Sequence, residues 1–287
     1  MNNLELKKHA NVVRKGIVTA VHSAKAGHPG GSLSAADMFT FLYFEEMNID
    51  PQNPKKEDRD RFVLSKGHTA PGLYSALANR GYFPVEDLTT LRKLGSYLQG
   101  HPCVHIPGVD MSSGSLGQGI SAAVGMAMGG KLDNRDFRVY TMLGDGELEE
   151  GQVWEASMFA GHRKLDNLCV IVDNNNLQID GPIDQVCSPY PIDKKFEAFN
   201  FHVINIDAHD FDKAPLFASL PIFLPIQTFP FKPFPYFPIH NSKPSPEMNN
   251  HQPSKTDRHY ESIVLYLIIA GRYDGSQQLH SICPRPS

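Results

Sequence analysis

Residues 138–181 read RVYTMLGDGELEEGQVWEASMFAGHRKLDNLCVIVDNNNLQIDG and carry the clearest structural signal in the chain. An apolar run over 139–143 stops at Gly-Asp-Gly. Apolar residues at helical spacing follow over 150–163, and a β-branched run over 168–172 stops at an asparagine-rich turn. A strand, a helix and a strand of this length form a right-handed parallel unit. The stretch therefore predicts an α/β fold in which helices flank a parallel sheet.

Both strands of this unit end in polar turns, which the parallel arrangement brings to one edge of the sheet. Asp145 lies in the first turn and Asn175 in the second. Their side-chain oxygens suit a hard cation such as Mg²⁺, which also takes phosphate oxygens from its ligand. The glycines beside Asp145 allow backbone N–H groups to approach a phosphate. A lone Gly-Asp-Gly is usually an ordinary turn, but the two turns together favour a metal–diphosphate site.

The sequence up to about residue 212 extends the same domain. Apolar spacing and helix breakers predict helices at 6–24, 35–47, 71–80, 85–94 and 120–131, and strands at 61–65 and 201–207. From 213 onward the composition changes, and 215–253 interleaves proline with phenylalanine. Proline at this density removes strand donors and breaks helices. We therefore predict a domain over 1–212 and a poorly ordered, irregular tail over 213–287.

The overall composition is that of an ordinary globular protein, with a net charge of −4. No basic stripe indicates nucleic acid binding, no apolar run is long enough to span a bilayer, and the first residues carry no secretory signal. The four cysteines (Cys103, Cys169, Cys187 and Cys283) do not have metal-ligand spacing. We expect a cytoplasmic protein that binds neither nucleic acid nor membrane.

Several ordered motifs resemble those of transketolases, and specifically the N-terminal subunit of a split, two-chain transketolase. They are AKAGHPGGSLSAAD (24–37), DRFVLSKGHTAPGLYSAL (60–77), GHP (100–102), SGSLGQGIS (113–121), GDGELEEGQVWEA (144–156), VDNNNLQIDG (172–181) and HVINIDAHD (202–210). Their shared order is more specific than any one motif. The resemblance covers about residues 4–212, whereas 213–287 does not match.

This resemblance implies a thiamine diphosphate-binding fold and gives individual residues roles in holding the coenzyme. Asp145, Asn175 and the backbone carbonyl of Leu177 would ligate a divalent cation such as Mg²⁺, so that Asn175 also binds the coenzyme through the shared ion. Gly146 would hold the diphosphate through its N–H, and His68 would lie against the coenzyme.

The same resemblance implies roles nearer the reacting atoms. Gly114 and Leu116 would contact the aminopyrimidine ring of the coenzyme. His28 and His101 would line the substrate channel and hydrogen-bond the sugar near the reacting carbon, as catalytic residues. Glu150 matches an acidic residue that joins a carboxylate network at the subunit interface, and it completes the predicted catalytic set.

The implied activity is that of a transferase, which moves a two-carbon ketol unit between sugar phosphates, as in the pentose phosphate pathway. The glutamate that activates the aminopyrimidine belongs, in this family, to a pyrimidine-binding domain for which this chain has no room. We therefore expect a partner, the C-terminal transketolase subunit, in a hetero-oligomer. The chain alone would then be inactive.

Other interpretations stay open at this point. A deoxyxylulose phosphate synthase or a 2-oxo acid dehydrogenase subunit would keep the coenzyme but change the chemistry, although GHPGG and SLGQG together favour transketolase over the dehydrogenase. The abrupt change near 213 also fits a truncated or frameshifted, non-catalytic homologue. If the tail lacks the next strand of the sheet, an apolar edge is left unpaired, and we expect weaker coenzyme binding.

Overall fold

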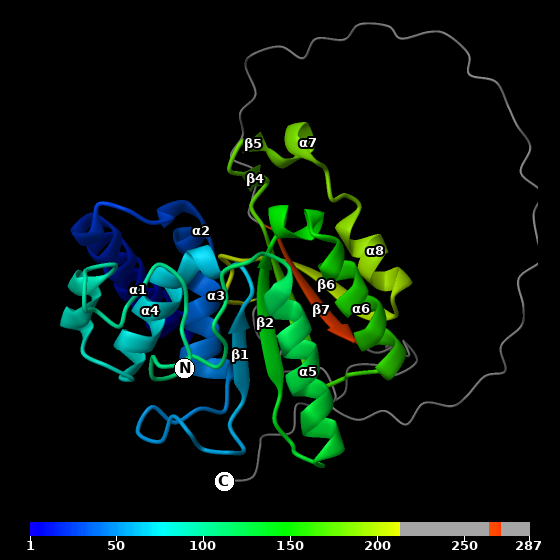
Figure 1. The fold of residues 1–287 in the computed structure, drawn as a ribbon, viewed down its shortest axis with the longest axis horizontal. Helices are drawn as coiled ribbons and strands as arrows, with labels where there is room; N and C mark the ends of the chain where they lie inside the picture. Colours follow the sequence, from blue (N-terminus) through cyan, green and yellow to red (C-terminus); the bar gives the residue numbers. More distant parts are fainter. Residues whose placement is uncertain (213–263, 271–287) are drawn as a thin grey trace, which may run out of the picture. The chain divides into compact units, whose positions relative to one another are not determined.

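The computed structural model describes residues 1–212 and the strand 264–270 (Figure 1). Its main sheet has the strand order β1 (Arg61–Leu64), β2 (Val139–Gly144), β3 (Leu168–Asn174), β7 (Val264–Ala270) and β6 (Phe201–Asp207). Strands β1, β2 and β3 run parallel to one another. The predicted α/β fold with a parallel sheet and flanking helices is therefore confirmed.

The predicted strand–helix–strand unit forms as β2, a 3₁₀ turn (Gly146–Glu149), α6 (Gly151–Arg163) and β3. Every residue of β3 is buried, as expected for a parallel strand with helices on both faces of its sheet. The register places Gly144 opposite Asp173. The two polar turns therefore leave the sheet side by side.

Helices pack on both faces of the sheet (Figure 1). Besides α6 they are α1 (Asn3–Ala24), α2 (Pro29–Ser34), α3 (Ala36–Phe41), α4 (Ala70–Arg80), α5 (Gln118–Leu132) and α8 (Ile192–Ala198). The short α7 (Ile183–Val186) lies away from the main sheet, beyond its edge (Figure 1). Side chains of α1, α3 and α4 form one core with Tyr140 and Met142, and those of α5, α6 and α8 form a second core with Val139 and Leu143. Successive residues of β2 thus pack into the cores on opposite faces of the sheet, because side chains alternate between the two faces along a strand.

Two of the predicted helices take other forms. The range 35–47 folds as α3 followed by a π-helical turn, Leu42–Glu46, and the range 85–94 folds as a shorter 3₁₀ helix, Val85–Thr90. The second ends early because the chain turns at Arg92, which has a positive φ of 60°. Apolar spacing alone does not distinguish these tighter or wider turns from an α-helix.

The small elements near the sheet edge complete the frame of the site. A 3₁₀ turn, Gly67–Thr69, connects β1 to α4. After β3, the short strands β4 (Leu177–Gln178) and β5 (Gly181–Pro182) pair in an antiparallel hairpin. These segments lie at the carboxyl ends of the strands, where the ligand site was predicted.

Strand β7 is an element that the sequence did not predict. It lies between β3 and β6 and is antiparallel to both, so the described sheet is mixed. By pairing on its two sides, β7 satisfies backbone groups that β3 and β6 would otherwise leave open. The unpaired edge expected after β3 therefore does not occur among the described strands. The rest of the predicted irregular tail, 213–263 and 271–287, lies outside the described residues.

None of the helices in the described ranges has the length and apolar character needed to cross a bilayer.

Candidate functional site

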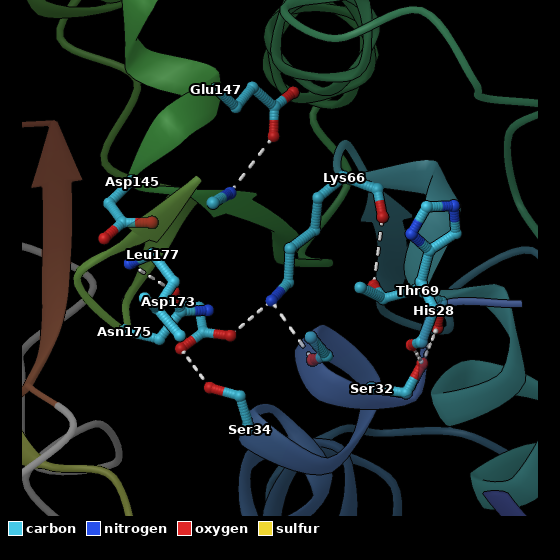
Figure 2. Close-up of polar contacts among 12 residues, drawn as sticks. His28, Ser32, Ser34, Lys66, Thr69, Asp145, Glu147, Asp173, Asn175 and Leu177 are labelled. Atoms are coloured by element: carbon cyan, nitrogen blue, oxygen red, sulfur yellow. Dashed lines mark hydrogen bonds and ion pairs between the residues drawn. The ribbon is translucent and has the colours of Figure 1, made fainter. Parts of the chain in front are cut away.

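The two predicted turns meet at the carboxyl edge of the sheet, and Asp145 connects them. Its carboxylate accepts the backbone N–H of Gly146 at 3.0 Å and that of Asn176 at 2.7 Å. The second bond crosses from the turn after β2 to the turn after β3. Asp145, Asn175 and Leu177, the residues expected to ligate a cation, are thereby brought to one edge (Figure 2).

The carboxylate of Asp145 is buried, with 1% of the residue exposed. Burial raises the pKa of Asp145 to about 6; its two backbone hydrogen bonds oppose the rise, and the charge of Asp173 adds to it. No ion pair to Asp145 occurs within residues 1–212. A buried carboxylate with a raised pKa and no ion-pair partner among these residues is a suitable ligand for a divalent cation, which would neutralise its charge.

The turn after β3 offers oxygen ligands. The side-chain oxygen of Asn175 accepts the N–H of Leu177 at 3.1 Å. Asn176 has a left-handed φ of 61°, which asparagine tolerates, and the hydroxyl of Tyr190 lies 2.7 and 2.6 Å from the side-chain oxygens of Asn174 and Asn176. In the part of the chain that the structure describes, no three acidic, histidine or cysteine side chains gather around a metal position. A cation here would therefore depend on amide, carbonyl and phosphate oxygens as well.

Gly146, the expected diphosphate contact, lies where its turn meets the β4–β5 hairpin. A methyl group on its α-carbon would approach Cγ of Gln178 to 3.0 Å. A larger residue at this position would push against the hairpin that carries Leu177. The N–H of Gly146 donates to the carboxylate of Asp145 in this structure.

A buried ion pair that sequence reasoning missed lies next to this edge. The ammonium of Lys66 pairs with Asp173, whose other carboxylate oxygen accepts the hydroxyl of Ser34 at 2.7 Å. The same ammonium lies 3.5 Å from the carbonyl oxygen of Gly31 (Figure 2). Through these contacts the cluster connects the ends of β1 and β3 to α2. Its only signal in the sequence is a lysine directly after an apolar strand, and lysine is almost never buried unless it is paired.

Three predicted histidines come together beside the cluster. The rings of His28 and His68 meet edge to face, with centroids 5.1 Å apart. The ring of His101 lies against Gly114, where an added methyl group would be 3.4 Å from its Cγ. Burial, together with the charges of Lys66, His28 and His101, lowers the pKa of His68 to about 4, and the charge of Asp173 opposes this shift. His68 is therefore neutral at pH 7, with one nitrogen that donates and one that accepts.

The glycine-rich loop before α5 passes over the 3₁₀ turn that follows β1. A methyl group on Gly67 would lie 2.9 Å from the carbonyl carbon of Ser113. Gly117 has a left-handed φ of 79°, and a methyl group there would lie 2.9 Å from Cβ of Glu150. Leu116 is half-buried in the loop, and Glu150 is exposed just before α6. Glu150 thus lies against Gly117, the residue that follows Leu116 in this loop.

Glu147 is a further buried residue that sequence reasoning missed. It is buried, and it accepts hydrogen bonds from Ser65, Gly117 and Gly144. Burial raises the pKa of Glu147, and the three hydrogen bonds oppose that rise. Acids that precede a helix usually serve only its dipole, so the sequence alone does not separate Glu147 from the exposed Glu149 beside it.

The sequence matches the family described as "Transketolase, thiamine diphosphate binding domain" over residues 6–218. It is 48% identical over 211 residues to the 6-deoxy-6-sulfo-D-fructose transketolase subunit SqwG of Clostridium sp. (strain MSTE9), with 73% of this chain and 77% of that protein covered. It is 42% identical over 212 residues to one of the subunits of the apulose-4-phosphate transketolase of Phocaeicola vulgatus, with 74% and 75% covered.

Longer relatives match over a smaller part of their length. The transketolase of Homo sapiens is 44% identical over 209 residues, which cover 72% of this chain and 34% of that protein. The crystal structure of transketolase from Campylobacter jejuni has a TM-score of 0.70 at 34% identity, with 76% of this chain and 36% of that chain covered. The chain thus spans about three quarters of the two shorter relatives and about a third of the longer transketolases. These matches confirm the resemblance that the motifs indicated.

Proposed function

The chain belongs to the transketolase family, whose thiamine diphosphate binding domain it matches, and on this premise we propose that it is the N-terminal subunit of a two-chain transketolase. Its substrates are sugar phosphates, between which a two-carbon ketol unit moves. The observation that carries the proposal is the bond from Asn176 to Asp145, which joins two family motifs at one sheet edge. The relatives reported above are all transketolases, so a non-catalytic homologue or another thiamine diphosphate enzyme is not favoured.

The metal–diphosphate end of the coenzyme is held by the edge around Asp145. Asp145, Asn175 and the carbonyl of Leu177 ligate Mg²⁺ or another divalent cation, and Gly146 donates its N–H to the diphosphate. The fit rests on the buried Asp145 carboxylate, whose pKa burial raises to about 6, because a cation removes the cost of burying that charge. Bound thiamine diphosphate supplies a nucleophilic carbon and an electron sink.

The protein's own side chains bind and orient the remaining groups. His68 stays neutral, so it packs against the coenzyme without bringing a second positive charge to the cationic ring. Gly114 and Leu116 support the aminopyrimidine ring. His28 and His101 hydrogen-bond the sugar near the carbonyl that reacts, and such bonds act most strongly when charge develops on that oxygen.

The partner is a C-terminal transketolase subunit that carries the pyrimidine-binding domain. Two relatives of matching length carry the word subunit in their names, which supports a second chain. Glu150, exposed before α6, contributes to a carboxylate network with that partner in a hetero-oligomer. Action in the pentose phosphate pathway is part of this proposal, and the cytoplasmic location stays a prediction from the sequence.

Calorimetry on the chain co-purified with its partner tests the proposal. We expect saturable binding of thiamine diphosphate in the presence of Mg²⁺, and ketol transfer from a ketose phosphate to an aldose phosphate. Asp145→Ala should abolish the Mg²⁺-dependent binding, whereas Asp180→Ala, at an exposed acid of the same hairpin, should not. Turnover by the purified chain without a partner would contradict the two-chain assignment, and unchanged coenzyme affinity in Asp145→Ala would contradict the site.

A further inference from the structure

Three donors from three separate segments converge on the carboxylate of Glu147, which is 2% exposed. One oxygen accepts the hydroxyl of Ser65 and the N–H of Gly117 at 2.8 Å, and the other accepts the N–H of Gly144 at 3.1 Å. Figure 2 shows the Glu147 side chain with one of its hydrogen bonds as a dashed line. Glu147 thereby joins the end of β1, the loop before α5 and the end of β2.

Only a carboxylate of this length satisfies all three donors. An ionised carboxylate accepts on both oxygens and donates nothing, whereas an amide carries an NH₂ group on one side. Glutamine at this position would therefore place donors against at least one of the three donor groups. A buried N–H or O–H left without an acceptor is costly, so Glu147→Gln breaks at least one of the three hydrogen bonds while nearly conserving volume.

The two backbone donors belong to the two loops that carry the coenzyme contacts. Gly117 closes the segment that holds Gly114 and Leu116, and Gly144 directly precedes Asp145. The start of α5, directly after this loop, also packs closely on the residue that follows β1, since a methyl group on Gly119 would lie 2.5 Å from Cα of Ser65. The carboxylate of Glu147 thus connects the ring-binding loop directly to the turn that carries Asp145.

We propose that Glu147 is a positioning residue that holds the ring-binding loop, residues 114–117, at a fixed distance from the diphosphate turn at Asp145. The inference rests on the proposed function, because it assigns the two loops to the two ends of one coenzyme. Glu147 does not touch the reacting atoms. It acts by fixing where Gly114 and Leu116 meet the ring when the diphosphate is already anchored.

The chain contains its own optical reporter for this turn. Its single tryptophan, Trp154, donates its indole N–H to the carbonyl of Leu148 at 3.0 Å. Leu148 directly follows Glu147, so a shift of the 3₁₀ turn changes the surroundings of Trp154. The fluorescence of Trp154 therefore gives a signal that does not depend on turnover.

The test compares Glu147→Gln with Glu149→Gln, a matched control at the exposed acid two residues later. Hydrogen exchange of the full-length chain without coenzyme should show the amide of Gly117 or of Gly144 exchanging about tenfold faster in Glu147→Gln than in the wild type, since a charge-assisted bond to one of them is lost. Glu149→Gln should match the wild type. Trp154 emission should shift only in Glu147→Gln.

A second measurement separates positioning from general loss of structure. With the partner present, the affinity for thiamine diphosphate and Mg²⁺ should fall about tenfold in Glu147→Gln, while the affinity for inorganic diphosphate and Mg²⁺ changes less than about threefold. Equal losses for both probes would overturn the proposal, because a merely structural role weakens both. Unchanged exchange at both Gly117 and Gly144 would overturn it as well.

The outcomes also distinguish this inference from the proposed function. A wild-type complex that binds inorganic diphosphate but not thiamine diphosphate would contradict the proposed function. The exchange result would still show whether Glu147 holds the loop. If circular dichroism finds Glu147→Gln unfolded, Glu147→Asp keeps the charge but draws the carboxylate back by one methylene from the N–H groups of Gly117 and Gly144. Faster exchange at Gly117 or Gly144 in that variant supports the proposal, and unchanged exchange at both overturns it.

Discussion

Lys66 and Asp173 form an ion pair that is almost completely removed from solvent, at 1% and 0% exposure. Asp173 is the residue whose backbone carbonyl accepts the N–H of Asp145 at 3.1 Å. The pair therefore stabilises the end of β3, from which the turn that carries Asn175 begins. It also places a fixed positive charge beside an edge that we assign to a diphosphate.

Removing one member of this pair should be severely destabilising. Lys66→Met leaves the Asp173 carboxylate buried without its cation, and such a change lowers the unfolding free energy by about 3–5 kcal/mol. Urea denaturation of the full chain measures the loss. Lys194→Met is the control, because Lys194 pairs with Glu197 in solvent and its removal should leave the curve unchanged. Equal curves for both variants would mean that the ion pair contributes nothing.

Cation binding should depend on pH through Asp145. Its folded pKa of about 6 lies above the ordinary 3.8, so the metal-free folded chain binds more protons than the unfolded chain between about pH 4 and 6. The stability contributed by this group is thus present at low pH and falls as the pH rises through that window. A cation must displace the proton, so its affinity should rise about tenfold per pH unit below 6 and level off above it.

Calorimetric titration of Mg²⁺ with saturating thiamine diphosphate at several pH values measures this dependence. Asp145→Asn should remove the rise, because it has no proton to release. A Mg²⁺ affinity that stays flat between pH 5 and 7 in the wild type would show that Asp145 is not a ligand or that its carboxyl is already ionised there.

His28 and His101 should affect the reaction with the sugar, whereas His68 should affect the binding of the coenzyme. His28→Ala and His101→Ala should lower kcat/KM for a ketose phosphate by about 100-fold, the loss expected for a bond made to the reacting group. Their affinity for thiamine diphosphate should stay near that of the wild type. His68→Ala should instead weaken the binding of the coenzyme. His105→Ala, at an exposed histidine, is the control, and a similar loss in all four variants would refute specific roles.

The sequence predicted the parts of this molecule that depend on local patterns. The runs on either side of α6 identify β2 and β3, and the handedness of the crossover then places Asp145 near the turn at Asn175. Ser34, Lys66 and Asp173 were not predicted, because their burial depends on three segments that meet only after folding. A lysine or an acid looks the same in the sequence whether it ends in solvent or in a buried cluster.

The position of strand β7 in the sheet could not be predicted from the sequence either. The apolar residues of 264–270 were visible, but a short run does not reveal which strands it joins. Its place between β3 and β6 depends on pairings across about a hundred residues of sequence to Ile171 and about sixty to Ile204. The turn at 173–177, by contrast, follows its own strand directly, so the sequence located it.

The pairing of β7 can be tested with a single proline. Leu267 pairs with Ile171 of β3 and with Ile204 of β6, and proline removes an N–H from the middle of a strand. Leu267→Pro should lower the unfolding free energy by at least ~1 kcal/mol and promote aggregation through exposed strand edges. Asn249→Pro, outside the described residues, is the comparison. A melting temperature unchanged by Leu267→Pro would argue against the strand.

Two glycine-to-alanine variants should change stability in opposite directions. A methyl group on Gly67 would lie 2.9 Å from the carbonyl carbon of Ser113 and 3.0 Å from the nitrogen of Gly114. Because these are backbone atoms, the ring-binding loop must move, and Gly67→Ala should cost about 1–3 kcal/mol. In Gly125→Ala the new methyl group meets no atom within 4 Å, so this variant should gain up to ~1 kcal/mol from helix propensity in α5. Thermal unfolding measures both, and a stabilised Gly67→Ala would show that the loop does not rest on this turn.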